Sequence, residues 1–410
     1  MLVLKLAWRS LWRNRRRTLI SVLSLAFGVF LAMTFIAIAD GVYARVIDDA
    51  VRLQGGHITL EHPRYREAPA IDLSVSASPA LRKQIEGLPG VERTKALVAG
   101  QGVAKSGAGA VGVAVVGVEP EVERLTSPVP SKVVEGNYLT GTGKQEVLIG
   151  VDLAKQLKLE LGKKLVITTN DAQGNVVEEL FRVSGIFRLG TEEVDGYLVQ
   201  LPLPAAQRLY RLPDDRVTQV GVLLRDVDDK TRLLPRVAAL AGMGVAVLPW
   251  DEVMPELAGY IRMDGGSNVI LQGILLFLIL FTIFNTLLMS VLERRRELGV
   301  VLALGTPPGK LRLQVLTESA LLAFLGCSVG LLAGGLLSYY LVVHGLDLRS
   351  FMKEDMAISG IAVSPIMHAR LTPGLFCWVG GGMFLATLLL SLYPMHQAAR
   401  IEVADVIKIR

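Results

Sequence analysis

Two glycine-rich stretches have the residue types that bind nucleotide phosphates. GAGAVG (107–112) has the G-x-G-x-x-G spacing of a dinucleotide-binding turn, but VAVVGV follows it, a strand pattern where a helix should receive the phosphate. We therefore predict a glycine-rich hairpin. GTGKQE (141–146) resembles the end of a P-loop, yet Gln145 stands where Ser or Thr would hold magnesium and Tyr138 where the first glycine belongs. We expect any ATP hydrolysis to lie on another chain.

The histidines and cysteines do not form a recognisable ligand set. The five histidines (57, 62, 344, 368 and 396) lack H-E-x-x-H or a comparable spacing, and Cys327 and Cys377 both lie within apolar stretches. We expect no metal site, no cofactor and no catalytic residue, and a membrane-anchored enzyme is the least favoured function.

Four uncharged runs are long enough to cross a bilayer. The chain has 410 residues, 51% of them hydrophobic, and a mean hydropathy of +0.46, which indicates a protein that is part membrane and part globular. A spanning helix needs roughly 20 apolar residues. The predicted transmembrane helices are 18–39, 269–292, 319–343 and 371–395. The alternatives are buried helices of a soluble domain and, for the first run, a signal peptide, whose apolar region is usually shorter, about 7–15 residues.

Basic residues set the expected orientation. Cations precede the first run and no acid occurs before Asp40, so the positive-inside rule places the N-terminus in the cytoplasm. With four spans the C-terminus is also cytoplasmic (N-in/C-in). Segments 293–318 and 396–410 are then cytoplasmic, and segments 40–268 and 344–370 extracytoplasmic. The cations are Lys5, Arg9, Arg13, Arg15, Arg16 and Arg17.

Residues 1–17 have the pattern of an amphipathic helix. Leu4, Trp8, Leu11 and Trp12 share one helical face and the cations lie elsewhere, which is typical of a helix that lies on membrane lipid. A disordered basic tail is the alternative, and we expect no nucleic-acid partner.

The segment 40–268 predicts an α+β domain, because strand and helix patterns occur in mixed order. Val- and Ile-rich strands are expected at 57–60, 112–118, 146–150, 164–169, 179–187, 197–201 and 217–224. Helices are expected at 79–90, 152–162 and 204–212, and TNDAQGN (169–175) is expected to be a hairpin turn.

The predicted spans carry small and polar residues that indicate helix packing. Gly326, Gly330 and Gly334 recur at every fourth position of the third span, a pattern that lets another helix approach closely. Thr282, Asn285 and Thr286 form a polar cluster in the second span. Helix packing is the first interpretation of the glycines and of this cluster, and a substrate-facing role of Thr282 and Asn285 is the alternative.

The stretch ERRRELGVVLALG (293–305) follows the second span directly. If it is helical, Leu298, Val301, Leu302 and Gly305 share one face, and Gly305 with the prolines after it ends the helix. A short helix with an apolar stripe and a charged shoulder suits docking into a groove of a partner protein. A loop that only obeys the positive-inside rule is the alternative.

That stretch resembles the signature of the FtsX/MacB-type (type VII) ABC permease family, which commonly reads E-R-R-R-E-I-G-I-L-R-A-L-G. The layout of one span, a large extracytoplasmic domain and three further spans is similar to that family too. LAWRSLWRNRRRTLISVLSLAFGV resembles its usual opening. GVEPEVE (117–123) and VVEGNYL (133–139) resemble the lipoprotein-releasing (LolC/LolE-type) branch. The similarity covers nearly the whole chain.

The resemblance implies a permease subunit in the bacterial inner membrane. A separate ATPase of the LolD or MacB type would drive it, a second permease subunit would pair with it, and its movements would extract acylated lipoproteins for delivery to the outer membrane. A periplasmic lipoprotein carrier would be a further partner. The implied periplasmic core is MacB-like, with a porter-like part (about 41–125 and 226–265) and a sabre-like insert (about 126–225). The implied contact with the ATPase is Glu293, Arg294, Arg295, Arg296, Glu297, Leu298, Gly299, Val301, Leu302, Leu304 and Gly305.

Two departures and two alternatives accompany this resemblance. Thr306 to Gly309 replace the more usual polar link after A-L-G, and no ATPase domain precedes the first span, which argues against a MacB-like single-chain transporter. An efflux or antimicrobial-peptide permease has the same architecture. An FtsX-like scaffold that activates a cell-wall hydrolase usually has a smaller extracytoplasmic domain.

Overall fold

The computed structural model describes residues 2–13, 15–141, 145–348, 357–358, 361–362 and 366–399. The chain divides into two compact units. The helical unit comprises Met1–Val42, Arg262–Leu348 and Ile366–Arg410, and the β-rich unit comprises Tyr43–Ile261 and Arg349–Pro365.

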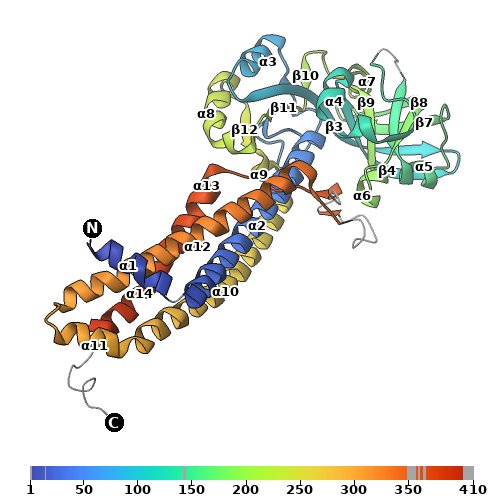
Figure 1. Ribbon diagram of the computed structural model, residues 1–410. Coiled ribbons are helices and arrows are strands. Elements are labelled where there is room, and N and C mark those ends of the chain that lie inside the picture. The colour runs from blue at the N-terminus through green and yellow to red at the C-terminus, as the bar shows by residue number, and fades with distance from the viewer. Residues whose placement is uncertain are drawn as a thin grey trace. The chain divides into compact units, whose positions relative to one another are not determined.

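Four long apolar helical segments dominate the helical unit (Figure 1), which confirms the four predicted spans. Each has an 18-residue window of mean hydropathy between 2.0 and 2.5. They are α2 (Arg15–Leu53), α10 (Pro255–Glu293), α12 (Pro308–His344) and a last segment made of α13 (Pro373–Phe376), a π-helical turn (Cys377–Gly381) and α14 (Gly382–Ala399). A helix satisfies its backbone hydrogen bonds internally, as a bilayer requires.

Two of these helices, α2 and α10, are longer than a bilayer is thick and have residues in both units. At about 1.5 Å per residue, the 39 residues of α2 and the 39 of α10 each extend about 58 Å, against roughly 30 Å of hydrocarbon. Residues 43–53 of α2 and 255–261 of α10 accordingly belong to the β-rich unit. Each of these helices is therefore a continuous connection between membrane and domain.

The helices pack through an apolar ridge on α2. Leu25, Val29, Met33 and Ala37 recur every fourth residue and form a buried cluster with residues of α10, α12 and the last segment, Cys327 among them.

The glycine stripe of α12 lies against α2. A Cβ on Gly330 would stand 2.6 Å from the carbonyl oxygen of Ala26, and one on Gly326 2.7 Å from the Leu25 side chain. A Cβ on Gly334 would be 3.2 Å from Met33. The absence of side chains here allows the two helices to approach closely.

The β-rich unit is built on a ten-stranded sheet of order β12-β1-β11-β3-β4-β9-β6-β8-β5, with β7 paired to β3 and β8. The pairs β4–β9 and β6–β8 are parallel and the others antiparallel, so the predicted mixed α+β class is confirmed. The strands are β1 (Ile58–Glu61), β3 (Val91–Ser106), β4 (Gly109–Val118), β5 (Val133–Gly136), β6 (Glu146–Gly150), β7 (Lys164–Asn170), β8 (Val176–Phe187), β9 (Leu198–Pro202), β11 (Gln219–Leu224) and β12 (Ala246–Pro249).

Short helices and two-stranded ladders complete the described chain. The helices are α1 (Leu2–Arg13), α3 (Pro79–Glu86), α4 (Pro120–Thr126), α5 (Val151–Gln156), α6 (Glu192–Asp195), α7 (Leu203–Leu209), α8 (Lys230–Ala241), α9 (Trp250–Val253) and α11 (Arg295–Ala303), with 3-10 turns at Val129–Lys132 and Val227–Asp229. The ladders pair β2 (Val75–Ser76) with β10 (Arg216–Val217), β13 (Leu346–Asp347) with β16 (Ile366–Met367), and β14 (Ala357–Ile358) with β15 (Ile361–Ala362).

Both predicted hairpin turns are confirmed. GAGAVG holds the hairpin turn between β3 and β4, in which Ser106 pairs with Gly109. The turn between β7 and β8 is fixed by Asp171, whose Oδ1 accepts hydrogen bonds from the backbone N–H of Gln173 and of Asn175. Because strand follows GAGAVG directly, no helix N-terminus is available there for a phosphate.

Several predicted elements had wrong limits. The helix expected at 152–162 ends at Gln156, since Lys158 takes a left-handed backbone conformation with φ 49°. The helix expected at 79–90 ends at Glu86, directly before Gly87. β3 was not predicted, because its 16 residues mix polar and apolar types without regular alternation.

Candidate functional site: the elbow between α10 and α12

The segment after the second span folds back in a short elbow, which we define as residues 293–308. α10 ends at Glu293, and Arg294 leaves helical geometry with φ −95° and ψ 11°. α11 then runs from Arg295 to Ala303, and α12 begins at Pro308. The sequence therefore makes two separate helices here, with a corner at the first arginine.

Gly305 ends α11, which confirms its predicted role. Its φ of +91° is a left-handed conformation that favours glycine. The backbone N–H of Gly305 donates to Leu302 O at 3.0 Å, and that of Thr306 donates to Val301 O at 3.3 Å. This is a Schellman motif, which satisfies carbonyl groups that the helix end would otherwise leave open. Pro308 follows as the first residue of α12.

Three of the four residues of the predicted apolar stripe of α11 face inward, whereas Gly305 is exposed. Leu298 is 4% exposed and packs with Val291, Leu311, Val315 and Ala398, and Leu302 packs against the same cluster. Gly299 is buried too, and Val301 is half-buried. The stripe therefore holds α11 to its own helical unit.

The opposite face of α11 carries the exposed apolar residues. Val300 is 52% and Leu304 82% exposed, and Arg296, one turn before Val300, is exposed as well. Residues 296, 300 and 304 are spaced by four and so share a face of the helix. We name them the α11 surface. Val300 did not stand out in the sequence, because Val and Leu occur on both faces.

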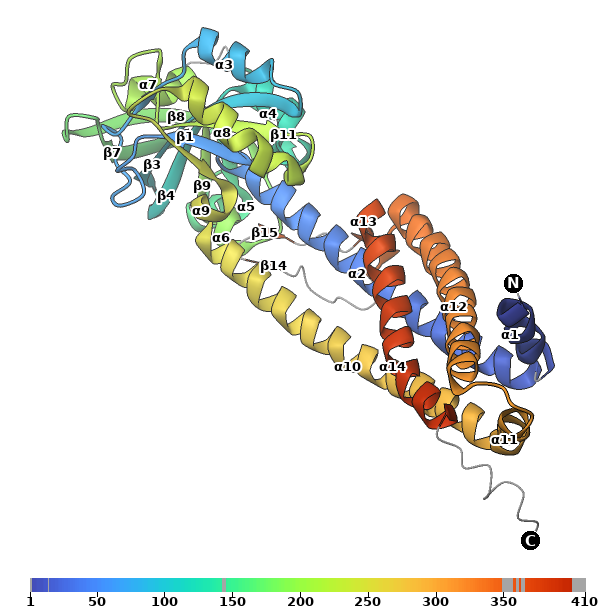
Figure 2. The ribbon, with the colours of Figure 1, turned by 90° about the vertical axis from the view of Figure 1, so that its left-hand side faces the viewer.

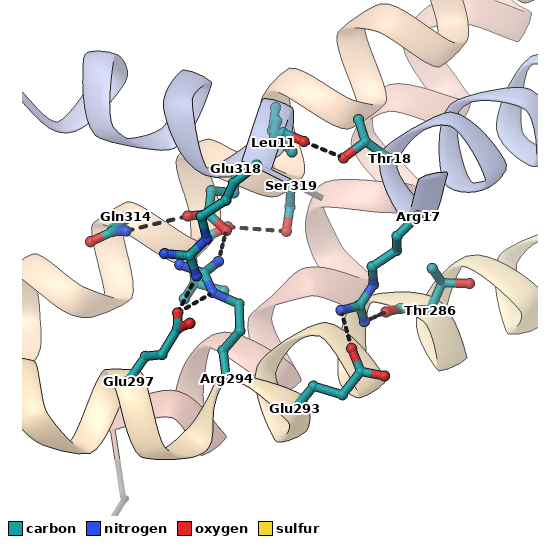
Figure 3. Close-up of polar contacts among 12 residues, drawn as sticks. Leu11, Arg17, Thr18, Thr286, Glu293, Arg294, Glu297, Gln314, Glu318 and Ser319 are labelled. Carbon is teal, nitrogen blue, oxygen red and sulfur yellow. Dashed lines mark hydrogen bonds and ion pairs between the residues drawn. The ribbon is translucent and has the colours of Figure 1, made fainter. Parts of the chain in front are cut away.

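Ion pairs fasten the elbow to the N-terminal part of the chain (Figure 3). Arg17 of α2 lies 2.7 Å from the Glu293 carboxylate and also donates to Thr286 O at 3.0 Å. Arg13, the last residue of α1, pairs with Glu297. The hydrogen bond from Arg13 holds the pKa of the Glu297 carboxyl below its usual value. The beginning of α2 and the elbow are thus joined by charge.

A less exposed pair joins the corner of the elbow to α12. Arg294 Nη1 lies 2.9 Å from Glu318 Oε2, and the two side chains are 16% and 11% exposed. Arg294 also contacts Glu297, and Gln314 donates to Glu318 at 3.3 Å (Figure 3). Removing one partner of such a pair leaves a charge poorly hydrated. The Arg294 side chain is therefore engaged in ion pairs within the protein, whereas the side chains of Arg295 and Arg296 are exposed.

Sequence reasoning missed the partners Arg13, Arg17 and Glu318 of this cluster. The signal available for Glu318 was its place at the border of an uncharged run, where a carboxylate needs a cation nearby. Nothing local indicated which arginine would supply it, because Arg294 is 24 residues away.

The amphipathic helix α1 lies along α12 in the helical unit (Figure 2). Ala7 and Leu11 are buried, whereas Trp8 and Trp12 are 44% and 52% exposed, with ring centroids 5.9 Å apart. The tryptophans thus do not share the burial of Leu11. Exposed indole rings on a basic helix are typical of a membrane interface.

The polar pair of the second span lies on an exposed face of α10. Thr282 and Asn285 are both exposed, and the Thr282 hydroxyl donates to Leu278 O in its own helix at 2.9 Å. A substrate-facing role for the pair stays a prediction.

Comparison with known proteins identifies the class of protein. It is a permease subunit with several spans and an α+β domain inserted after the first span. The family model of the MacB-like periplasmic core domain matches residues 18–240, and that of the FtsX-like permease C-terminal region matches residues 269–403. The chain belongs to the FtsX/MacB-type family of ABC transporter permeases.

Individual relatives are distant but extend over most of the chain. The lipoprotein-releasing system transmembrane protein LolC of Xylella fastidiosa (strain Temecula1) is 22% identical over 95% of this chain and 92% of its own length. LolC of Neisseria meningitidis is 22% identical over 95% of this chain and 94% of its own length. The pyoverdine export ATP-binding/permease protein PvdT of Pseudomonas entomophila is 24% identical over 82% of this chain and 52% of its own length.

Proposed function

We propose that this chain is the membrane subunit of an ABC complex that extracts lipoproteins from the bacterial inner membrane for delivery to the outer membrane. The similarity to LolC proteins over nearly their full length supports the substrate class. The main support from the structure is the α11 surface. It is exposed, whereas the other face of α11 packs against α10, α12 and α14. A separate ATPase of the LolD or MacB type would bind this surface.

The α11 surface suits a groove on an ATPase subunit. Leu304 and Val300 offer apolar contact and Arg296 a cation beside it, a combination that helix-in-groove recognition uses. Other residues would hold the elbow in place behind this surface, because they contact α1, α2, α12 and the apolar cluster around Leu298. They are Glu293, Arg294, Glu297, Leu298 and Leu302. Movement of the ATPase would then displace several spans together.

The proposed topology is N-in/C-in, with the β-rich unit in the periplasm and the elbow in the cytoplasm. A second permease subunit, identical or homologous, would complete the complex, and acylated lipoprotein would enter from the membrane beside Thr282 and Asn285. A periplasmic carrier would take up the released lipoprotein. Closure of the ATPase would move the periplasmic units without a pore through the bilayer.

Replacement of the α11 surface tests the ATPase contact. We expect Leu304→Asp to weaken co-purification of the ATPase at least about thirty-fold, because loss of an apolar anchor at an interface costs about 2 kcal/mol or more. Leu125→Asp is the matched control, since Leu125 on α4 is 66% exposed and receives the same change. Full association of the Leu304→Asp protein would place the ATPase contact elsewhere.

A transport assay tests the substrate class. The complex is placed in proteoliposomes with an acylated lipoprotein or with the same protein lacking its acyl chains, and ATP-dependent release is measured. We expect release of the acylated form alone.

Export of a small molecule is the second candidate, favoured by the similarity to PvdT. ATP-dependent movement of a non-acylated substrate, with no release of lipoprotein, would decide for that function.

A further inference from the structure

The last turn of α2 is hydrogen-bonded to a buried lysine of the sheet. Lys95 of β3 is 1% exposed, and its Nζ donates to the backbone carbonyl oxygen of Arg52 at 2.7 Å. Carbonyl groups at a helix C-terminus lack intrahelical donors and carry partial negative charge, which a cation stabilises. Glu123 of α4 is 2% exposed and lies 3.5 Å from the same Nζ.

The side chain of Arg52 is held separately from its backbone. Its Nε donates to Asp48 at 2.8 Å, and its Nη2 donates to Glu92 of β3 at 2.8 Å. A longer contact of 3.4 Å leads to Thr126 O at the end of α4. Arg52 therefore connects α2 to β3 and α4 through both backbone and side chain. We name Asp48, Arg52, Glu92, Lys95 and Glu123 the α2 joint.

The chain that leaves α2 is fastened next to the joint. Gly56 N–H donates to Val51 O at 2.9 Å, and His57 N–H donates to Val222 O at 2.9 Å. The His57 side chain is buried, and its Nδ1 accepts a hydrogen bond from Leu224 N–H of β11. Helix, turn and sheet are thus bonded over a few consecutive residues.

The α2 joint holds the end of α2 with charged rather than apolar side chains. An apolar contact of similar volume would hold a helix end as well or better, since burial of two charges is costly. One oxygen of Glu123 has no hydrogen-bond partner among the described residues, so the pair is not arranged for greatest stability. Hydrogen bonds to buried charges are directional, so a displacement of one partner weakens an interaction that water cannot replace in the interior.

We propose that the α2 joint makes the last turns of α2 and the sheet of the β-rich unit move as one rigid body. Its five residues are positioning residues, and this inference rests on the proposed function, in which movement of the spans must reach the periplasmic unit. Without the joint, α2 would bend at its last turn, and ATP hydrolysis would continue while lipoprotein release failed.

The test replaces the buried pair by neutral side chains of similar size, Lys95→Met with Glu123→Gln. The control, Lys105→Met with Glu178→Gln, makes the same changes in a pair 2.9 Å apart that also starts on β3 but is 42% and 55% exposed. ATP hydrolysis and lipoprotein release are measured on the full complex in proteoliposomes. We expect hydrolysis within about twofold of the unsubstituted complex and release per ATP reduced at least tenfold, with the control unchanged.

Hydrogen exchange on the full-length protein separates this inference from the proposed function. We expect the amides of Gly56 and His57 to exchange at least tenfold faster in the Lys95→Met/Glu123→Gln protein than in the control. Unchanged exchange of these amides would overturn the proposed role of the α2 joint. A decline in lipoprotein release that only follows a decline in ATP hydrolysis would overturn it too. Absence of lipoprotein release by the unsubstituted complex would instead refute the proposed function, and the exchange result would still decide on the joint.

Discussion

Protonation of His57 is expected to destabilise the β-rich unit. The imidazole is buried between the end of α2 and β11, and this burial lowers its pKa from 6.5 to about 4. Its Nδ1 accepts the Leu224 N–H, so this nitrogen is unprotonated in the folded state. The charged groups that face the ring are Asp48, Arg52, Glu92 and Asp226, and their combined effect is smaller than that of burial.

The magnitude follows from the two pKa values. Above pH 6.5 the imidazole is neutral in both the folded and the unfolded protein, and the stability is fully present. Between pH 6.5 and about 4 only the unfolded state binds the proton, so the free energy of unfolding falls as the pH falls. At about 1.4 kcal/mol per pH unit, the loss is about 2 kcal/mol at pH 5 and about 3 kcal/mol below pH 4.

Denaturant unfolding of the detergent-solubilised protein at pH 7.5 and pH 5 measures this loss. Carboxylates contribute to any pH dependence, so the informative quantity is the difference between the unsubstituted protein and His57→Gln. We expect His57→Gln to lose about 2 kcal/mol less between the two pH values. His62→Gln, a change in a half-buried histidine of the same segment, is the control. Equal pH dependence in the unsubstituted and His57→Gln proteins would refute the argument.

Two further perturbations address the helical unit. Gly330→Ala places a Cβ 2.6 Å from a backbone oxygen that cannot easily move, so we expect about 1–3 kcal/mol of destabilisation in a detergent unfolding assay, whereas Gly273→Ala, with open space at its Cβ, should have little effect. Arg294→Glu opposes Glu318 with a like charge and should cost about 3 kcal/mol or more in the same assay, and the double exchange Arg294→Glu/Glu318→Arg should recover part of that loss. If the Arg294→Glu protein were as stable as the Arg294→Glu/Glu318→Arg protein, the ion pair between Arg294 and Glu318 would not be formed.

The architecture could be predicted because its signals are local. An uncharged run of more than 20 residues such as 269–292 allows few interpretations, and Gly305 before two prolines marks a helix end without knowledge of the rest of the fold. The two hairpin turns are local for the same reason. These features depend on residues that are neighbours in the chain.

The exposed face of α11 and the contacts of the α2 joint could not be predicted, because they depend on residues far apart in the chain. Helical periodicity finds an apolar face on α11 at Leu298 and Leu302, but it cannot tell whether that face meets a partner or the protein's own α12 and α14. Lys95 likewise lies in an irregular pattern of β3, and its partners Arg52 and Glu123 are 43 and 28 residues away. Only the folded sheet brings these three together.

The proposed coupling requires a stiff connection, and α2 meets this requirement better than α10. α2 has no proline in its 39 residues, and charges hold it near both ends, with Arg17 in the elbow cluster and Arg52 in the α2 joint. Proline and paired glycines are the usual causes of a kink. α10 contains the pair Gly265–Gly266 with open space around both positions. A displacement imposed at Arg17 would therefore arrive at Arg52 largely undiminished, whereas α10 can absorb part of one by bending, and in the proposed function α2 is the principal path from the elbow to the β-rich unit.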